Sequence, residues 1–108
     1  MIVNSIYIVD DDDAVRASLH SLLSLAFEAH IHNFRTGDDF LAVQEGLDPG
    51  CLLLDLHMPG TNGMQVLEHV ADKGRFAPII LTGRGDLQTA VAALKGGGVR
   101  FHRKALCL

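Results

Sequence analysis

Three acidic side chains in this sequence directly follow apolar runs, at the points where predicted strands end. Asp10 and Asp11 follow the run at residues 6–9, and Asp55 follows the run at residues 51–54. Carboxylates brought together in this way repel one another unless they take up protons or a cation neutralises them. A hard divalent ion such as Mg²⁺ suits a site with few protein carboxylates and several waters. Such an ion would also support phosphoryl transfer to a carboxylate nucleophile, for which Asp55 is the candidate.

Two further polar side chains are predicted at the same edge of the structure. Thr82 follows the apolar run at residues 79–81, and Lys104 follows a predicted strand at residues 99–102. A hydroxyl group and a lysine ammonium are suitable partners for phosphoryl oxygens. Each of the acids taken alone could equally be a strand-end cap or a surface charge, so the hypothesis depends on Asp10, Asp11 and Asp55 occurring together.

The apolar patterns predict the elements that would position these residues. β-Branched and aromatic runs predict strands at residues 5–9, 29–34, 51–54, 79–81 and 99–102. Apolar residues at helical spacing predict helices between them, at residues 14–27, 36–43, 63–71 and 87–95. Asp12 or Asp13 is expected to cap the first helix, and Arg16 lies off its apolar stripe. Pro78 is expected to precede the fourth strand.

Strands that alternate with helices of about ten residues predict right-handed crossovers and a parallel sheet. In a doubly wound sheet the first and third strands are neighbours, so their terminal acids would share one crevice.

The composition indicates one ordinary globular domain. Of the 108 residues 48% are apolar and 20% charged, the net charge is −4, and the basic residues concentrate near the end of the chain. We therefore expect no direct binding of nucleic acid. No apolar run approaches the ~20 residues of a membrane helix, and no signal peptide is visible. Cys51 and Cys107 are expected to be reduced thiols, which fits a cytoplasmic location.

These motifs together resemble the receiver domain of bacterial two-component response regulators. The resemblance covers residues 6–104, with motifs at 8–12, 54–63 and 81–86, and with Phe101 three residues before Lys104. The Thr-Gly-x-Gly-Asp motif that begins at Thr82 is similar to that of the FixJ-like subfamily. The resemblance implies a flavodoxin-like α/β fold with a five-stranded parallel sheet of order 2-1-3-4-5. We expect a single receiver domain over residues 1–108 that departs from the family in lacking the final helix, and no output domain.

The resemblance assigns a role to each residue of the acidic group. Asp55 is expected to accept a phosphoryl group from a sensor histidine kinase. Asp11 would bind Mg²⁺ directly and Asp10 partly through water, while Asp55 and the backbone carbonyl of His57 would complete the ligands. The domain would therefore be a signalling domain, at most catalysing its own phosphotransfer and dephosphorylation.

The remaining roles concern the switch. The resemblance implies that Thr82 and Lys104 hold the phosphoryl group and that Thr82 and Phe101 report phosphorylation to a partner surface. In the family Pro usually follows the lysine in a cis bond, whereas Ala105 follows here. A cis bond before Ala costs ~3 kcal/mol, so a trans bond is expected.

Two alternatives remain open at this point. The first is a binding module that keeps the fold but has lost switching. The second is an aspartyl-phosphate phosphatase, a class that usually has a second Asp where this chain has His57. A missing final helix would leave apolar surface uncovered, so self-association through that face is also expected.

Overall fold

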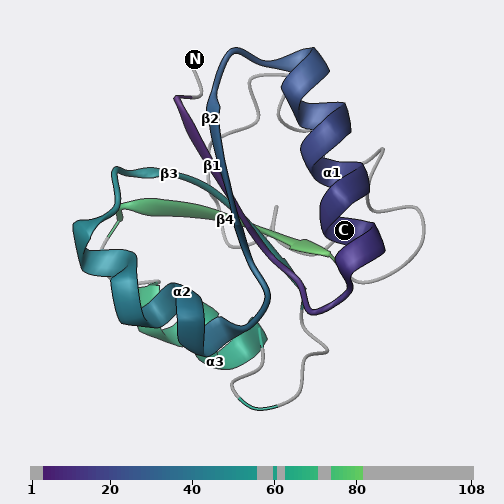
Figure 1. Ribbon diagram of the computed structural model, residues 1–108. Helices are drawn as coiled ribbons and strands as arrows, with labels where there is room; N and C mark the ends of the chain where they lie inside the picture. The colour runs from purple at the N-terminus through teal and green to yellow at the C-terminus, as the bar shows by residue number, and fades with distance from the viewer. Residues whose placement is uncertain (1–3, 56–59, 61–62, 71–73, 82–108) are drawn as a thin grey trace.

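The computed structural model describes residues 4–55, 60, 63–70 and 74–81, in which strands and helices alternate (Figure 1). The elements are, in chain order, β1 (Ser5–Val9), α1 (Asp13–Ala26), β2 (His30–Phe34), α2 (Gly37–Val43), the 3₁₀ turn η1 (Gln44–Gly46), β3 (Gly50–Asp55), α3 (Gly63–Val70) and β4 (Phe76–Leu81). Among these residues, no helix is long and apolar enough to cross a membrane.

The four described strands form one parallel sheet in the order β2-β1-β3-β4. This confirms the predicted α/β fold, the parallel sheet and the order of its first four strands. The fifth strand predicted at residues 99–102, and whatever follows it, lie outside the described residues. Helix α1 covers one face of the sheet, and α2 and α3 cover the other (Figure 1).

Both faces of the central strands are buried because their side chains alternate between two cores. The core on the α1 side contains Ile6, Ile8, Leu19, Leu23, Cys51, Leu53, Ile79 and Leu81. The core on the α2 and α3 side contains Tyr7, Val9, Phe40, Leu52, Leu54, Val66, Val70, Phe76 and Ile80. The continuous apolar runs in β1 and β3 are therefore explained by burial on both sides.

Side-chain caps fix where the helices begin. The Asp12 carboxylate accepts from the amides of Ala14 at 2.9 Å and Val15 at 3.2 Å, so α1 begins directly after the acidic turn. Thr36 caps α2 in the same way, through a bond from the Asp39 amide at 3.0 Å. The cap at Asp12 confirms the predicted start of the first helix.

The predicted start of the fourth strand was wrong. β4 begins at Phe76, so Pro78 lies within the strand, paired with Leu52, and does not precede it. The Gly50 amide donates to the Arg75 carbonyl at 3.0 Å, which fixes the residues of β4 that face β3. Since backbone groups alternate along a strand, the nitrogen of Pro78 faces away from β3 and no bond of that ladder is lost.

Candidate functional site

The register of β1 and β3 brings the acids of the two strands together. Val9, the last residue of β1, pairs with Leu54, so Asp10 and Asp55 each lie one residue further along at the same edge of the sheet. Asp11 follows in the turn before α1. This edge is the carboxyl end of parallel strands, the position at which open α/β sheets bind ligands.

One carboxylate oxygen from each of Asp10, Asp11 and Asp55 lies within 4.8 Å of the other two. We call these three residues the acidic cluster. The predicted convergence of the three acids is thereby confirmed. Asp10 is buried, Asp55 is half-buried and Asp11 is exposed, so the cluster opens to solvent on one side. Such a donor set fits a hard divalent cation that retains several waters.

Asp10 shows the electrostatic cost of this arrangement. Burial, with smaller contributions from the charges of Asp55 and Asp11, raises the pKa of Asp10 to about 6. A hydrogen bond from the Asp12 amide, 2.9 Å from Asp10 Oδ1, acts in the opposite direction. Repulsion among these carboxylates would be relieved by a proton or, more completely, by a bound cation.

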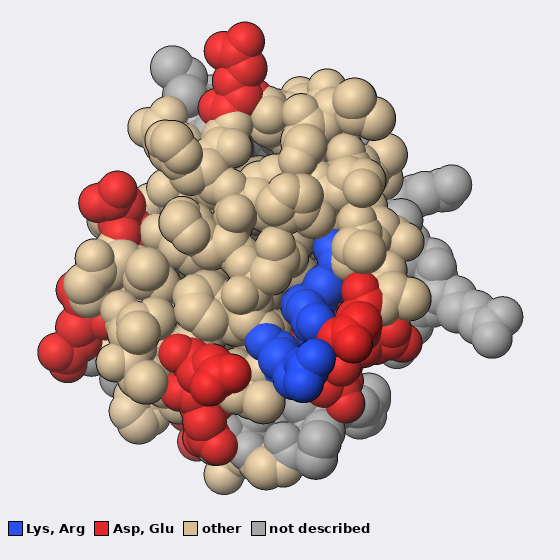
Figure 2. Space-filling view, viewed as in Figure 1, with Lys and Arg blue, Asp and Glu red and all other residues tan. Residues whose placement is uncertain are grey.

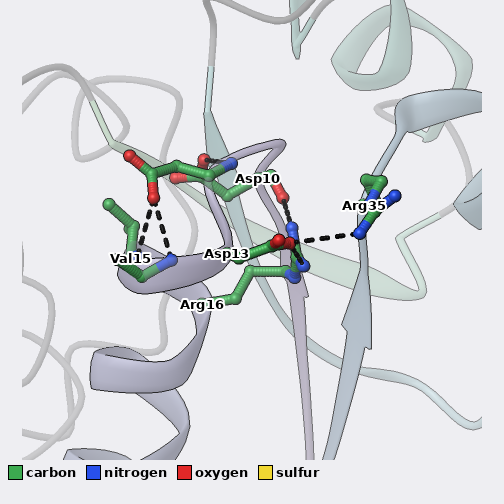
Figure 3. A network of polar contacts seen from close by, with 7 residues as sticks. Asp10, Asp13, Val15, Arg16 and Arg35 are labelled. Carbon is green, nitrogen blue, oxygen red and sulfur yellow. Dashed lines mark hydrogen bonds and ion pairs between the residues drawn. The ribbon is translucent and has the colours of Figure 1, made fainter.

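The turn that carries Asp10 and Asp11 is held by a network of polar contacts (Figure 3). The Asp10 amide donates to the Phe34 carbonyl at 3.1 Å, which ties the turn to the end of β2. The guanidinium of Arg16 donates through Nη1 to the Asp10 carbonyl at 2.6 Å and through Nη2 to the Asp13 carboxylate. Arg35 pairs with the same carboxylate of Asp13 at 3.4 Å.

The surface reflects this pairing of charges. On the face of the molecule drawn in Figure 2, basic side chains are gathered in one place, with acidic side chains beside them. Arg16 and Arg35, together with Asp13, form a group of this kind. The hydrogen bond from Arg16 and the charge of Arg35 both lower the pKa of Asp13.

The other predicted site residues lie outside the described residues. These are His57, Thr82, Phe101 and Lys104. Their expected roles in binding the metal, holding the phosphoryl group and switching therefore stay predictions.

Sequence reasoning missed one residue beside the acidic cluster. Arg16 was recognised only as lying off the apolar stripe of its helix. The spacing of Asp13 and Arg16, three residues apart in a helix, could have indicated their ion pair. The contact with the Asp10 carbonyl has no comparable signal, because it depends on how the chain turns from β1 into α1.

Comparisons with known proteins agree with this geometry. The family of response regulator receiver domains matches the chain over residues 6–106. The transcriptional regulatory protein FixJ of Bradyrhizobium diazoefficiens is 41% identical over 101 residues, which is 92% of this chain and 48% of that protein. The crystal structure of full-length FixJ from B. japonicum is 38% identical with a TM-score of 0.68, over 90% of this chain and 48% of that one.

A more distant structure shares the fold alone. The response regulator TrrA from Thermotoga maritima, solved in complex with Mg²⁺-BeF, is 23% identical with a TM-score of 0.68, over 84% of this chain and 79% of that one. The present chain spans about half the length of the curated relatives it matches. The match over residues 6–106, with the acidic cluster at the expected edge of the sheet, shows that the chain belongs to the family of two-component response regulator receiver domains.

Proposed function

We propose that this receiver domain accepts a phosphoryl group on Asp55 while Mg²⁺ is bound by the acidic cluster. The observation that carries the proposal is the position of Asp55, at the carboxyl end of β3 with an oxygen within 4.8 Å of those of Asp10 and Asp11. A half-buried carboxylate at this edge is open to a phosphoryl donor, and its neighbours are suited to hold a cation.

In the proposed reaction a carboxylate oxygen of Asp55 attacks phosphorus. A new P–O bond forms as the P–N bond of a phosphohistidine breaks, and the electron pair of that bond returns to the imidazole of the donor. When bound, Mg²⁺ would neutralise charge on the transferred group. The carboxylates of Asp10 and Asp11 would hold the cation. The Mg²⁺-BeF complex of TrrA, a protein of the same fold, supports this choice of ion.

Membership of the receiver family supports the rest of the assignment. We infer that the donor is a sensor histidine kinase and that the backbone carbonyl of His57 adds a metal ligand. Thr82 and Lys104 would contact the phosphoryl oxygens, and Thr82 with Phe101 would carry the switch. A domain that reacts once at its own carboxylate is a signalling component, not a turnover enzyme.

Incubation with acetyl phosphate and Mg²⁺, followed by intact mass measurement, tests the proposal. The wild-type chain should gain ~80 Da, the mass of one added phosphoryl group, and Asp55→Asn should gain nothing because an amide is not a nucleophile. Asp48→Asn is the matched control, since Asp48 is an exposed acid outside the acidic cluster and its backbone carbonyl, which accepts from the Tyr7 hydroxyl at 2.6 Å, is kept in the variant. Labelling of Asp55→Asn, or loss of labelling in both variants, would refute Asp55 as the acceptor.

We also infer self-association, which the sequence suggested on other grounds. Leu19 and Leu23 of α1 are buried against the sheet, so they are not available to a partner. Val15 and Leu25 on the same helix are 37% and 86% exposed and offer apolar contacts. Light scattering over a concentration series tests this inference. A constant monomer mass at high concentration would contradict it.

A further inference from the structure

Arg16 connects helix α1 to the main chain of the turn that carries two members of the acidic cluster. Its Nη1 donates to the Asp10 carbonyl at 2.6 Å, and its Nη2 donates to Asp13 in the first turn of the helix (Figure 3). The Arg16 side chain is 14% exposed, whereas Asp13 is 70% exposed. The inner contact of this guanidinium is therefore the one with the backbone of Asp10.

Arg16 does not act by neutralising the cluster. It donates to the carbonyl oxygen of Asp10, while the carboxylate of Asp10 accepts from the Asp12 amide. The negative charge of the cluster is thus left for a cation to neutralise.

A restraint on the turn between β1 and α1 is needed because the carboxylates of the acidic cluster repel one another. Asp11 is exposed, so rotation of the turn would let its carboxylate move away from Asp10 and Asp55 into solvent. Two hydrogen bonds from backbone amides oppose that movement: the Asp10 amide donates to the Phe34 carbonyl, and the Asp12 amide donates to Asp10 Oδ1. The contact from Arg16 is a third, and it is charge-assisted and therefore stronger than a neutral one.

We propose that Arg16 is a positioning residue for the acidic cluster. By holding the Asp10 carbonyl it keeps the turn between β1 and α1 in the conformation that presents Asp10 and Asp11 to a divalent cation. This inference rests on the proposed function for its metal, and its geometric part can be tested without metal.

The test is a Mg²⁺ titration of the 108-residue chain followed by NMR, with Arg16→Ala, Arg16→Lys and Arg35→Ala. Arg35→Ala is the matched control, because it removes a cation that pairs with the same Asp13, and among the described residues Arg35 forms no hydrogen bond or ion pair with Asp10. Removing a positive charge near a cation site should by itself tighten Mg²⁺ binding. If Arg16 positions the turn, Arg16→Ala should instead weaken Mg²⁺ binding, roughly tenfold.

Arg16→Lys keeps the charge but loses the two-pronged geometry, so it should weaken binding by a smaller factor than Arg16→Ala. It also carries the test if Arg16→Ala fails to fold. Mg²⁺ binding in the Arg16 variants that is as tight as in the wild type, or tighter, would overturn the proposal.

Amide hydrogen exchange without metal provides the second readout. The Asp12 amide should exchange several-fold faster in Arg16→Ala, while the Phe27 amide, bonded to Leu23 at the far end of α1, should be unchanged. Equal acceleration of both amides would mean general destabilisation and would overturn the positioning role. Failure of the wild-type chain to bind Mg²⁺ would instead refute the proposed function. An unchanged exchange rate of the Asp12 amide in Arg16→Ala would refute the role of Arg16 separately.

Discussion

Asp10 lies beside Asp55 at the carboxyl ends of two neighbouring parallel strands, because Val9 and Leu54 are paired in the β1–β3 register. In this position the pKa of the buried Asp10 carboxyl is raised to about 6, mainly by burial and to a smaller extent by the charge of Asp55. The fold therefore places negative charge where it is unfavourable without a counterion.

The stability of the metal-free chain should fall as the pH rises from about 4 to above 6. A carboxyl whose pKa is higher in the folded state binds its proton more tightly there, so its stabilising contribution is complete below the unfolded pKa. That contribution is lost as the pH rises through the folded value of about 6. Urea midpoints measured at several pH values, in wild type and in Asp10→Asn, test this prediction.

Asp10→Asn should remove this part of the pH dependence, because the amide oxygen can still accept from the Asp12 amide and has no charge to bury. Asp39→Asn, at an exposed acid in α2, is the control and should retain the wild-type decline. The comparison between variants matters because Asp13, whose pKa is lowered, has the opposite dependence on pH. Identical profiles for Asp10→Asn and wild type would contradict the prediction.

Mg²⁺ should raise the melting temperature of the chain. A ligand at ten times its Kd stabilises the native state by about 1.4 kcal/mol, which raises Tm by roughly 4–8 °C per kcal/mol in a domain of this size. Asp11→Ala should abolish this response. It should also leave the metal-free form at least as stable as wild type, because the charge of Asp11 repels the carboxylate of Asp10.

The comparison with other salts decides whether the effect is specific. NaCl at equal ionic strength screens the carboxylates but cannot bridge them, so it should shift Tm much less than MgCl₂ in wild type. Equal shifts with both salts, or an undiminished Mg²⁺ response in Asp11→Ala, would mean that the acidic cluster does not bind the ion specifically.

Local patterns were sufficient to predict several elements and the convergence of the cluster. The run at residues 5–9 gives β1 as observed, and Asp12 and Thr36 cap their helices, because these signals lie within a few residues of one another. The order of the four described strands is the one that the resemblance to receiver domains implied. The meeting of Asp10 with Asp55 then follows from that order.

Features that depend on the partner strand or on the path of a turn could not be predicted in this way. Pro78 is a local signal for a strand end, but its place within β4 depends on which side of the strand faces β3. The bond from Arg16 to the Asp10 carbonyl is likewise a tertiary contact, although the residues are only six apart. Sequence spacing alone carries no information on either orientation.

Replacement of Gly50 should be costly for a steric reason. A Cβ at this position would lie 2.3 Å from the Ser5 carbonyl oxygen, a backbone atom of the neighbouring strand that cannot move without disturbing the β1–β3 pair. Gly50→Ala should therefore lower the free energy of unfolding by about 1–3 kcal/mol or more, as overpacking does in other cores. Urea denaturation monitored by circular dichroism measures the loss.

Gly46→Ala is the matched control for this prediction. A Cβ at Gly46, the last residue of η1, would meet no atom within 4 Å, and its φ is not in the left-handed region. Replacing it should be neutral or stabilising by up to about 1 kcal/mol, since alanine has fewer unfolded conformations to lose. A loss at Gly50 with no loss at Gly46 would attribute the effect to contact with Ser5 and not to a general cost of replacing glycine. No loss of stability at Gly50 would show that the β1–β3 pair can separate enough to accept a methyl group, and the rigid spacing that holds Asp10 beside Asp55 would then be in doubt.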